Sequence, residues 1–298
     1  MSFSFDTKNE LCKLNIQRTC CARAEAYGIL LYCHTFNSAE IRIITGNANF
    51  AARIPKLFQR AFGLRFDRLP DTEEGKRIFQ MTDPGKLNHI INLLGYDPKQ
   101  HLALHINFGL LEEGCCRSAF LRGCFFAGGS IMDPQKRYHL ELTCSHLQAS
   151  RELEALLREC GYRPKSVTRN SSFVTYFKQS DQIEDFLTFI GAPSAAMTIT
   201  SAKLEKDLRN SVNRRLNCDT ANLDKAVVAA QEQLEAIRRL REAGALERLP
   251  DKLKETAALR LANPELSLSE LAEVFSPPVT KSCLSHRLRK LSQLAKDM

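Results

Sequence analysis

The sequence is poor in glycine and proline, with 14 and 11 of these residues among 298, and it contains no long apolar run. The low content of glycine and proline excludes a fibrous chain, and a hydrophobic content of 44% is too high for a disordered chain. The longest uncharged stretch, residues 26–39, is too short and too polar to span a bilayer, which needs about 20 apolar residues. The N-terminus lacks a basic segment followed by an apolar one. We therefore expect a globular, cytoplasmic protein without a secretory signal or a membrane partner.

The eleven cysteines include no C-x-x-C pair, although two pairs are adjacent in the chain, Cys20–Cys21 and Cys115–Cys116. A disulfide framework is typical of small secreted chains, and this chain is neither small nor expected to be secreted. Most of the cysteines lie in apolar segments, as Cys124 does, where a free thiol behaves as a small buried hydrophobic group. We interpret them as free thiols.

Two other pairs have a spacing that suits metal ligands: Cys144 with His146, and His101 with His105. A structural zinc site uses four ligands at recognisable spacing, and neither pair is accompanied by a second one. We therefore expect no metal ion and no other cofactor.

The first two hundred residues alternate between helix-like and strand-like patterns. The predicted helices are 18–33, 49–62, 84–95, 114–128, 146–160 and 181–190. The predicted strands are 35–36, 41–45, 64–69, 76–82, 130–132, 137–144, 163–169 and 172–178. Each half follows the order α-β-β-α-β-β-α over about one hundred residues, which indicates an internal repeat. The fold class is therefore α+β, with a pseudo-twofold domain over 1–193 whose halves are 1–95 and 96–193.

Strand patterns end after Pro193. Residues 194–217 are polar and basic and predict a helical linker. An amphipathic helix follows, with Leu223, Val227 and Ile237 on one face that must pack against another element. We assign 218–298 to an all-α DNA-binding domain.

The last fifty residues predict three short helices, the second and third joined by a tight turn, which form a helix-turn-helix over 251–295. The second helix opens with a capping box, in which Ser267 and Glu270 satisfy each other's backbone amides. The third begins near Thr280, a favourable N-cap, and buries leucines on one face.

The third helix is basic. Residues 279–296 contain five Lys or Arg and no Asp or Glu, within a chain of net charge +8. We expect its N-terminal residues to reach base edges and its later residues to grip phosphates. The alternative is a solvated helix face that only closes a small bundle. The predicted DNA-binding residues are Ser269, Thr280, Lys281, Ser282, Ser285, His286, Arg287, Arg289 and Lys290.

Two segments resemble the core helices of LAGLIDADG homing endonucleases: Leu121-Arg-Gly-Cys-Phe-Phe-Ala-Gly-Gly129 and Ala26-Tyr-Gly-Ile-Leu-Leu-Tyr-Cys-His34. Gly123 and Gly28 correspond and would let the two helices pack closely. Together with FLRGCFFAGGSI…YHLEL, the run Asn213–Leu223 and the terminal helix-turn-helix, the chain resembles the WhiA family over nearly its whole length. That resemblance implies a LAGLIDADG-like domain followed by a helix-turn-helix. It also implies a bacterial DNA-binding protein linked to sporulation, cell division and chromosome segregation.

The chain departs from the endonucleases where catalysis would occur. Those enzymes end each core helix with an acidic residue, and the two carboxylates hold metal ions over the scissile phosphates. The corresponding positions here are Cys33 and Gly128, which offer no carboxylate, although divalent metals such as Mg²⁺ need hard oxygen ligands. We expect a scaffold that has lost its catalyst.

The leading hypothesis is a non-enzymatic transcription regulator that binds double-stranded DNA at the nucleoid and takes no small-molecule substrate. A second is a divergent metal-dependent nuclease that uses Asp133, Glu141 or other acids. A third, compatible with the first, is an interaction module whose N-terminal domain binds another protein.

Overall fold

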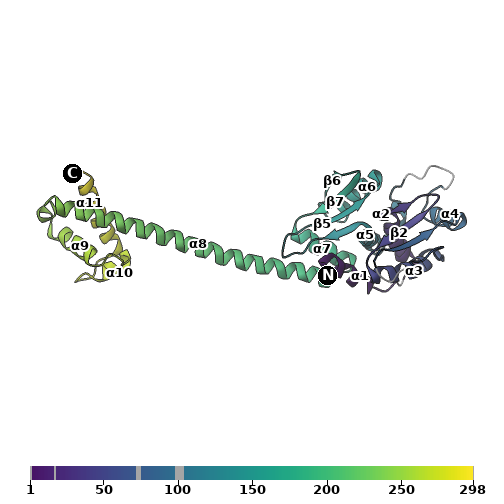
Figure 1. Ribbon diagram of the computed structural model, residues 1–298, viewed down its shortest axis with the longest axis horizontal. Helices are drawn as coiled ribbons and strands as arrows, with labels where there is room; N and C mark the ends of the chain where they lie inside the picture. Colours follow the sequence, from purple (N-terminus) through teal and green to yellow (C-terminus); the bar gives the residue numbers. More distant parts are fainter. Residues whose placement is uncertain (1, 17, 72–74, 98–103, 298) are drawn as a thin grey trace. The chain divides into compact units, whose positions relative to one another are not determined.

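A computed structural model describes residues 2–16, 18–71, 75–97 and 104–297 (Figure 1). The chain forms two compact units, Met1–Lys206 and Asp207–Met298. The boundary falls inside one helix, α8 (Pro193–Glu242). The division predicted at 193 therefore coincides with the start of this helix, and the division predicted at 217 falls in its interior.

The first unit combines helices with two antiparallel sheets. Its helices are α1 (Phe3–Cys12), α2 (Thr19–Tyr32), α3 (Ala48–Phe62), α4 (Pro84–Leu93), α5 (Gly114–Gly128), α6 (Leu147–Glu159) and α7 (Ser180–Ile190), with a 3-10 turn at Phe108–Leu110. Six of these helices confirm the prediction within two residues at each end. Helix α1 was not predicted, because its sequence has no clear apolar stripe and buries only Thr7 and Leu11.

The two sheets belong to the two halves of the repeat. The first contains β1 (Thr35–Phe36), β2 (Ile41–Thr45) and β3 (Arg77–Met81), in the order β1-β2-β3. The second contains β4 (Gly129–Ile131), β5 (Leu140–Cys144), β6 (Lys165–Arg169) and β7 (Ser172–Phe177), in the order β4-β5-β7-β6. The mixed helix-and-sheet fold class is confirmed.

The prediction of a strand over 64–69 was wrong. Within this segment, Arg68 makes one isolated bridge to Gln80. The carboxylate of Asp67 instead accepts the backbone N–H groups of Thr82 and Asp83 at 2.7 and 2.8 Å and pairs with Lys86. These side-chain bonds compete with a regular ladder, so the described first half has one strand fewer than the repeat predicted.

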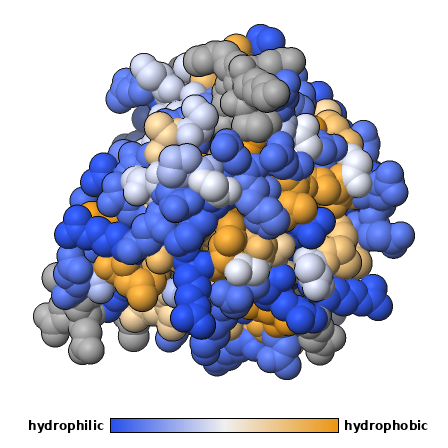
Figure 2. Space-filling model, turned by 90° about the vertical axis from the view of Figure 1, so that its right-hand side faces the viewer, coloured by the Kyte–Doolittle hydropathy of each residue, from blue (hydrophilic) through white to orange (hydrophobic). Residues whose placement is uncertain are grey.

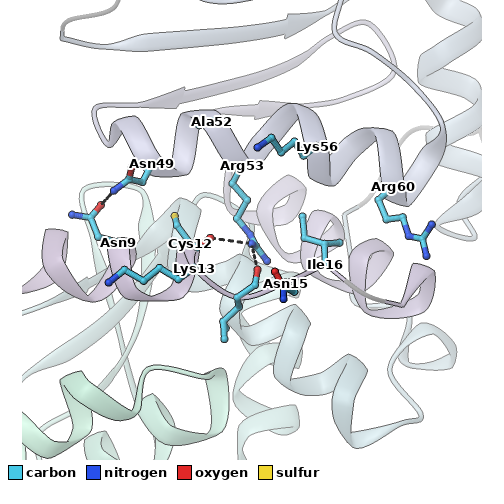
Figure 3. Close-up of a pocket in the computed structure, with 11 residues that line it drawn as sticks. Asn9, Cys12, Lys13, Asn15, Ile16, Asn49, Ala52, Arg53, Lys56 and Arg60 are labelled. Atoms are coloured by element: carbon cyan, nitrogen blue, oxygen red, sulfur yellow. Dashed lines mark hydrogen bonds between the residues drawn. The ribbon is translucent and has the colours of Figure 1, made fainter.

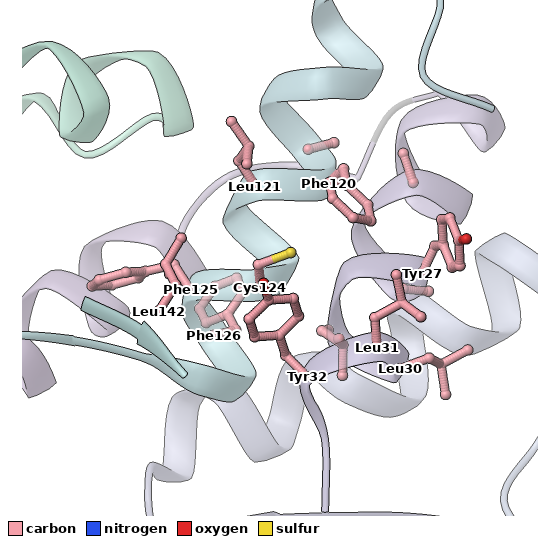
Figure 4. Close-up of a cluster of buried hydrophobic side chains, with 14 of the residues drawn as sticks. Tyr27, Leu30, Leu31, Tyr32, Phe120, Leu121, Cys124, Phe125, Phe126 and Leu142 are labelled. Atoms are coloured by element: carbon pink, nitrogen blue, oxygen red, sulfur yellow. The ribbon is translucent and has the colours of Figure 1, made fainter. Parts of the chain in front are cut away.

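Helices α2 and α5 form the centre of the first unit and confirm the close packing expected from their glycines (Figure 4). A Cβ atom on Gly28 would lie 2.2 Å from the carbonyl oxygen of Phe120, and one on Gly123 would lie 2.1 Å from that of Glu25. The two backbones are therefore in direct contact. Aromatic side chains surround this crossing; the rings of Tyr27 and Phe120 are 5.4 Å apart.

A buried charge network joins the two halves beside this crossing. Glu25, on α2, is 2% exposed and accepts hydrogen bonds from Arg53 Nε at 2.7 Å and from Arg122 Nε at 2.8 Å. Arg53 also donates to the carbonyl of Leu14, and Arg122 donates to that of Ile190. Each buried charge thus has a partner, as burial requires.

The second unit packs three helices against the end of α8. They are α9 (Asp251–Ala262), α10 (Leu268–Glu273) and α11 (Lys281–Lys296), with a 3-10 turn at Leu246–Arg248. The predicted capping box is present. The hydroxyl of Ser267 accepts the backbone N–H of Glu270 at 3.3 Å, and the carboxylate of Glu270 accepts the backbone N–H of Ser267 at 2.9 Å. The core residues are Ile237, Leu240, Leu253, Ala257, Leu271, Ala272, Phe275, Leu284, Leu288 and Leu291.

The apolar stripe predicted on α8 packs only near its C-terminal end. Ile237 is fully buried, whereas Leu223 and Val227 are 64% and 48% exposed. The expectation that this whole stripe is covered was therefore wrong for the chain alone. Within the described ranges, no helix has both the length and the apolar character needed to cross a membrane.

Candidate nucleic-acid interface

Helix α11 presents one buried face and one polar, basic face. Its N-cap is Thr280, whose hydroxyl accepts the backbone N–H of Cys283 at 3.2 Å, as predicted. Leu284, Leu288 and Leu291 are buried in the core of the second unit. The opposite face is exposed to solvent and carries Lys281, Ser282, His286, Arg289 and Lys290.

This face is positive along its length, because residues 279–296 contain no Asp or Glu. The free backbone amides of the first turn add the positive end of the helix dipole beside Lys281. Such an arrangement attracts an anion near the helix start and a polyanion along the exposed face.

The connection between α10 and α11 spans residues 274–280. It is longer than the turn of about 3–4 residues in a compact helix-turn-helix, so the tight turn expected from the sequence is not what forms. The connection is nevertheless fixed, since Phe275 is buried and the N–H of Val279 donates to the carbonyl of Ala272 at 3.0 Å. Helix α11 is therefore held in one orientation against α10.

Arg287 differs from the other predicted phosphate ligands. Its guanidinium lies over the ring of Phe275, 5.6 Å from the centroid, and its Nη1 atom is buried without a hydrogen-bond partner among the described residues. The side chain is half-buried, whereas Arg289 is exposed. Arg287 lies three positions after the buried Leu284 and four before the buried Leu291, so the helical period places it beside the buried stripe, a sequence signal that Arg289 lacks.

The remaining predicted residues lie near the start of the two helices. Ser269 is exposed in the first turn of α10, and Ser285 is partly exposed on α11 between Lys281 and Arg289. The structure thus gathers Lys281, Ser285 and Arg289 on one helix and leaves Ser269 on another.

Cys33 and Gly128, which were predicted to correspond to the metal-binding positions of the endonucleases, lie at the ends of the core helices. Cys33 is the C-cap of α2, and its thiol donates to the carbonyls of Leu30 and Thr35 at 3.2 Å each. Burial raises the pKa of this thiol to about 12, so it is neutral at pH 7. Gly128 is the last residue of α5, where a Cβ atom would lie 2.3 Å from the carbonyl oxygen of Thr143. Position 128 therefore has no room for a carboxylate side chain.

Asp133 and Glu141, the acids of the nuclease hypothesis, have structural partners. Asp133 accepts the N–H of Gln135 at 2.9 Å and closes a turn. Glu141 bonds to His139 at 3.1 Å and to Arg169 at 3.3 Å. In the part of the chain that the structure describes, neither acid belongs to a group of three or more ligand side chains.

Two other pairs were considered as metal ligands: Cys144 with His146, and His101 with His105. Cys144 donates its thiol proton to the carbonyl of His146 at 3.4 Å. His101 lies outside the described residues, and His105 lies in a segment without helical structure.

A cavity of about 650 Å³ lies between α1 and α3 in the first unit (Figure 3). Lys13, Lys56 and Arg60 give it a basic lining. Arg53 enters it from α3 but is already bonded to Glu25 and to backbone carbonyls. Figure 2 shows another face of the same unit, where hydrophilic residues separate small hydrophobic patches.

Comparison with known proteins matches both units. The profile of the WhiA C-terminal HTH domain matches residues 212–295, and that of the WhiA LAGLIDADG-like domain matches residues 117–209. The chain is 36% identical to a "Probable cell division protein WhiA" of Ruminiclostridium cellulolyticum, over 99% of this chain and 97% of that protein. It is also 36% identical to the protein of that name from Heliobacterium modesticaldum, over 99% and 96% of the two chains.

Among solved structures, the chain is similar to full-length DUF199/WhiA from Thermatoga maritima, with a TM-score of 0.62 and 22% identity. That similarity covers 100% of this chain and 99% of the other. It supports the fold, a LAGLIDADG-like unit followed by a helical one.

Proposed function

This chain belongs to the WhiA family, and we propose that it is a non-enzymatic, sequence-preferring DNA-binding protein that reads double-stranded DNA with α11. The observation that carries the proposal is the exposed, acid-free face of α11, which is fixed on a three-helix core by buried leucines. A recognition helix needs one buried and one exposed face, because the first must pack on the core while the second enters the major groove.

The exposed residues differ in their proposed roles. Side chains in the first two turns of α11 approach base edges: Lys281, Ser282, Ser285 and His286. Side chains at the two helix starts and further along α11 contact phosphates: Ser269, Thr280, Arg289 and Lys290. We assign Arg287 an orienting role, because it packs on Phe275 and so holds α11 against the connection that follows α10. Phosphate contacts position the helix, and base contacts select the sequence.

The cellular role follows from the relatives. Their name, cell division protein, supports a role in cell division for this chain as well. We propose that it acts in the cytoplasm at the nucleoid as a transcription regulator, with effects on chromosome segregation and, where it occurs, sporulation. No catalytic group is assigned, since Cys33 and Gly128 supply no metal ligand of the required kind.

The test begins by selecting duplexes bound by the full-length chain from a random pool. The selected duplex is then titrated by fluorescence anisotropy at several salt concentrations. The double substitution Arg289→Gln/Lys290→Gln should weaken binding to every sequence and reduce the salt slope by about 0.9 for each lost phosphate contact. The matched control is Arg209→Gln/Arg214→Gln, which removes the same charge from exposed positions of α8 and should change binding little.

Base reading is tested separately. Lys281→Ala should change the selected sequence, since a good base contact discriminates by about 1–3 kcal/mol. If the α8 variant weakens binding as much as the α11 variant, or if Lys281→Ala and wild type select the same sequence with the same affinity, α11 is not the reading element.

A further inference from the structure

Four cysteines from opposite halves of the chain converge at one end of the central helix pair. Cys20 and Cys21 lie in the first turn of α2, and Cys115 and Cys116 lie in the first turn of α5. Their four Sγ atoms all lie within 4.8 Å of one another. In the described part of the chain, this is the one group of three or more potential ligand side chains that meets such a limit.

The internal repeat explains the convergence. Cys20 and Cys115 are separated by 95 positions, and so are Cys21 and Cys116 and the two glycines at the helix crossing, Gly28 and Gly123. The two cysteine pairs are therefore equivalent under the pseudo-twofold relation. The common separation of 95 positions is the sequence signal that could have revealed the cluster. A search for C-x-x-C spacing does not detect it.

The distances suit a single tetrahedral ion. A zinc–sulfur bond of about 2.3 Å places the sulfurs of a tetrahedral site about 3.8 Å apart. Cys20 and Cys21 already have Sγ atoms 3.9 Å apart, and the widest pair would need to approach by about 1 Å at most. A disulfide needs about 2.05 Å between sulfurs, and the structure holds all four residues as free thiols.

Positive groups lie beside the four cysteines. Both cysteine pairs lie at helix N-termini, where the helix dipole favours negative charge. Arg18 Nη1 lies 4.0 Å from the Cys115 sulfur. Arg23 lines a cavity with Cys20 and Cys116, and its buried Nε has no hydrogen-bond partner among the described residues.

We propose that Cys20, Cys21, Cys115 and Cys116 bind one zinc ion. Four thiolates around one ion form a closed structural site, and soft sulfur ligands select zinc over magnesium or calcium. Cys20 and Cys115 are exposed, so the ion reaches the site from solvent, whereas Cys116 is buried. The bound ion links the two halves of the first unit at the N-terminal ends of their core helices. This revises the expectation, drawn from the sequence, that the chain takes no cofactor.

The test uses the full-length chain, purified under reducing conditions without a metal-binding tag. Elemental analysis should find about one zinc ion per chain in the wild type. The double variant Cys20→Ser/Cys115→Ser changes only exposed side chains, so circular dichroism should show a folded protein, and its zinc content should fall at least tenfold. Cys218→Ser, an exposed cysteine on α8, is the matched control and should retain the ion.

A second readout identifies the ligands. Cobalt(II) added to the metal-free wild type should give the visible bands of a tetrahedral thiolate site, and these bands should be absent from the double variant. Equal zinc in wild type and double variant, no cobalt bands in the wild type, or iron in place of zinc would overturn the proposal. So would a disulfide between the two cysteine pairs, found by peptide mapping of protein that was never reduced.

Discussion

Replacing Gly28 by alanine tests the close contact between α2 and α5 on which the first unit depends. The new methyl carbon would lie 2.2 Å from the carbonyl oxygen of Phe120 and 2.9 Å from the backbone nitrogen of Cys124. Ordinary contact begins at 3.4 Å. Both obstructing atoms belong to the backbone of α5 and cannot rotate away, so the helices must separate by about 1 Å.

The magnitude follows from two opposing effects. Alanine in a helix interior is favoured over glycine by up to about 1 kcal/mol. Overpacking typically costs about 1–3 kcal/mol, and more where rigid groups collide. We expect a net loss of about 2–3 kcal/mol in the free energy of unfolding. For a unit of about 200 residues this lowers Tm by about 4–12 °C.

The assay must follow the first unit alone. The chain has no tryptophan, and its six tyrosines lie between Tyr27 and Tyr176. Thermal unfolding followed by near-ultraviolet circular dichroism of tyrosine therefore reports on the first unit. Gly114→Ala is the matched control, because a Cβ atom at this first residue of α5 meets nothing within 4 Å. It should leave Tm unchanged or raise it slightly.

Gly28→Ala must lower Tm, and Gly114→Ala must not, for the reasoning to hold. A Gly28→Ala protein as stable as wild type would show that the helices are not in backbone contact. A similar loss in Gly114→Ala would show that the effect comes from helix propensity or handling rather than from the crossing.

Two further predictions concern buried charge. Glu25→Gln leaves the buried guanidinium of Arg53 without a counter-charge and should lower the free energy of unfolding in urea by about 3–5 kcal/mol. The control, Glu235→Gln in the exposed pair with Arg239, should lower it by less than about 1 kcal/mol. Equal losses in the two variants would count against the network. Burial lowers the pKa of Lys8 to about 8 from an ordinary 10.5, so between these values the unfolded chain binds more protons than the folded one and stability rises with pH. Relative to Lys8→Met, the wild type should therefore gain stability from pH 8 to 10.5, and a constant difference in unfolding free energy would contradict the shift.

Features fixed by local chemistry were predictable from the sequence. The capping box at Ser267 and Glu270, the N-cap Thr280 and the buried leucines of α11 each depend on neighbours within a few positions. The helix crossing was also predictable, because a glycine recurs at the same place in both halves. The exposed basic face of α11 follows from the same helical periodicity.

Features that depend on distant parts of the chain were not predictable. The network around Glu25 joins residues 28 and 97 positions away, and nothing near Glu25 marks a buried carboxylate. The segment 64–69 has a strand-like composition, but the Asp67 carboxylate bonds to the backbone after β3 instead. Arg287 and Arg289 are alike in type. The helical period places Arg287 nearer the buried leucines, but its contact with the ring of Phe275 depends on another part of the unit.

At the end of α5 the backbone itself leaves no room for a metal-binding carboxylate. At position 128 the end of α5 lies so close to β5 that even a methyl group would meet the carbonyl of Thr143 at 2.3 Å and the ring of Tyr32 at 2.7 Å. At position 33 the thiol is bonded inward to two carbonyls, so a carboxylate there would face acceptors rather than donors. The same tight packing that needs glycine at the helix crossing therefore excludes a metal-binding carboxylate at the end of α5. The proposal that α11 reads DNA therefore needs no metal-binding site at the ends of the core helices.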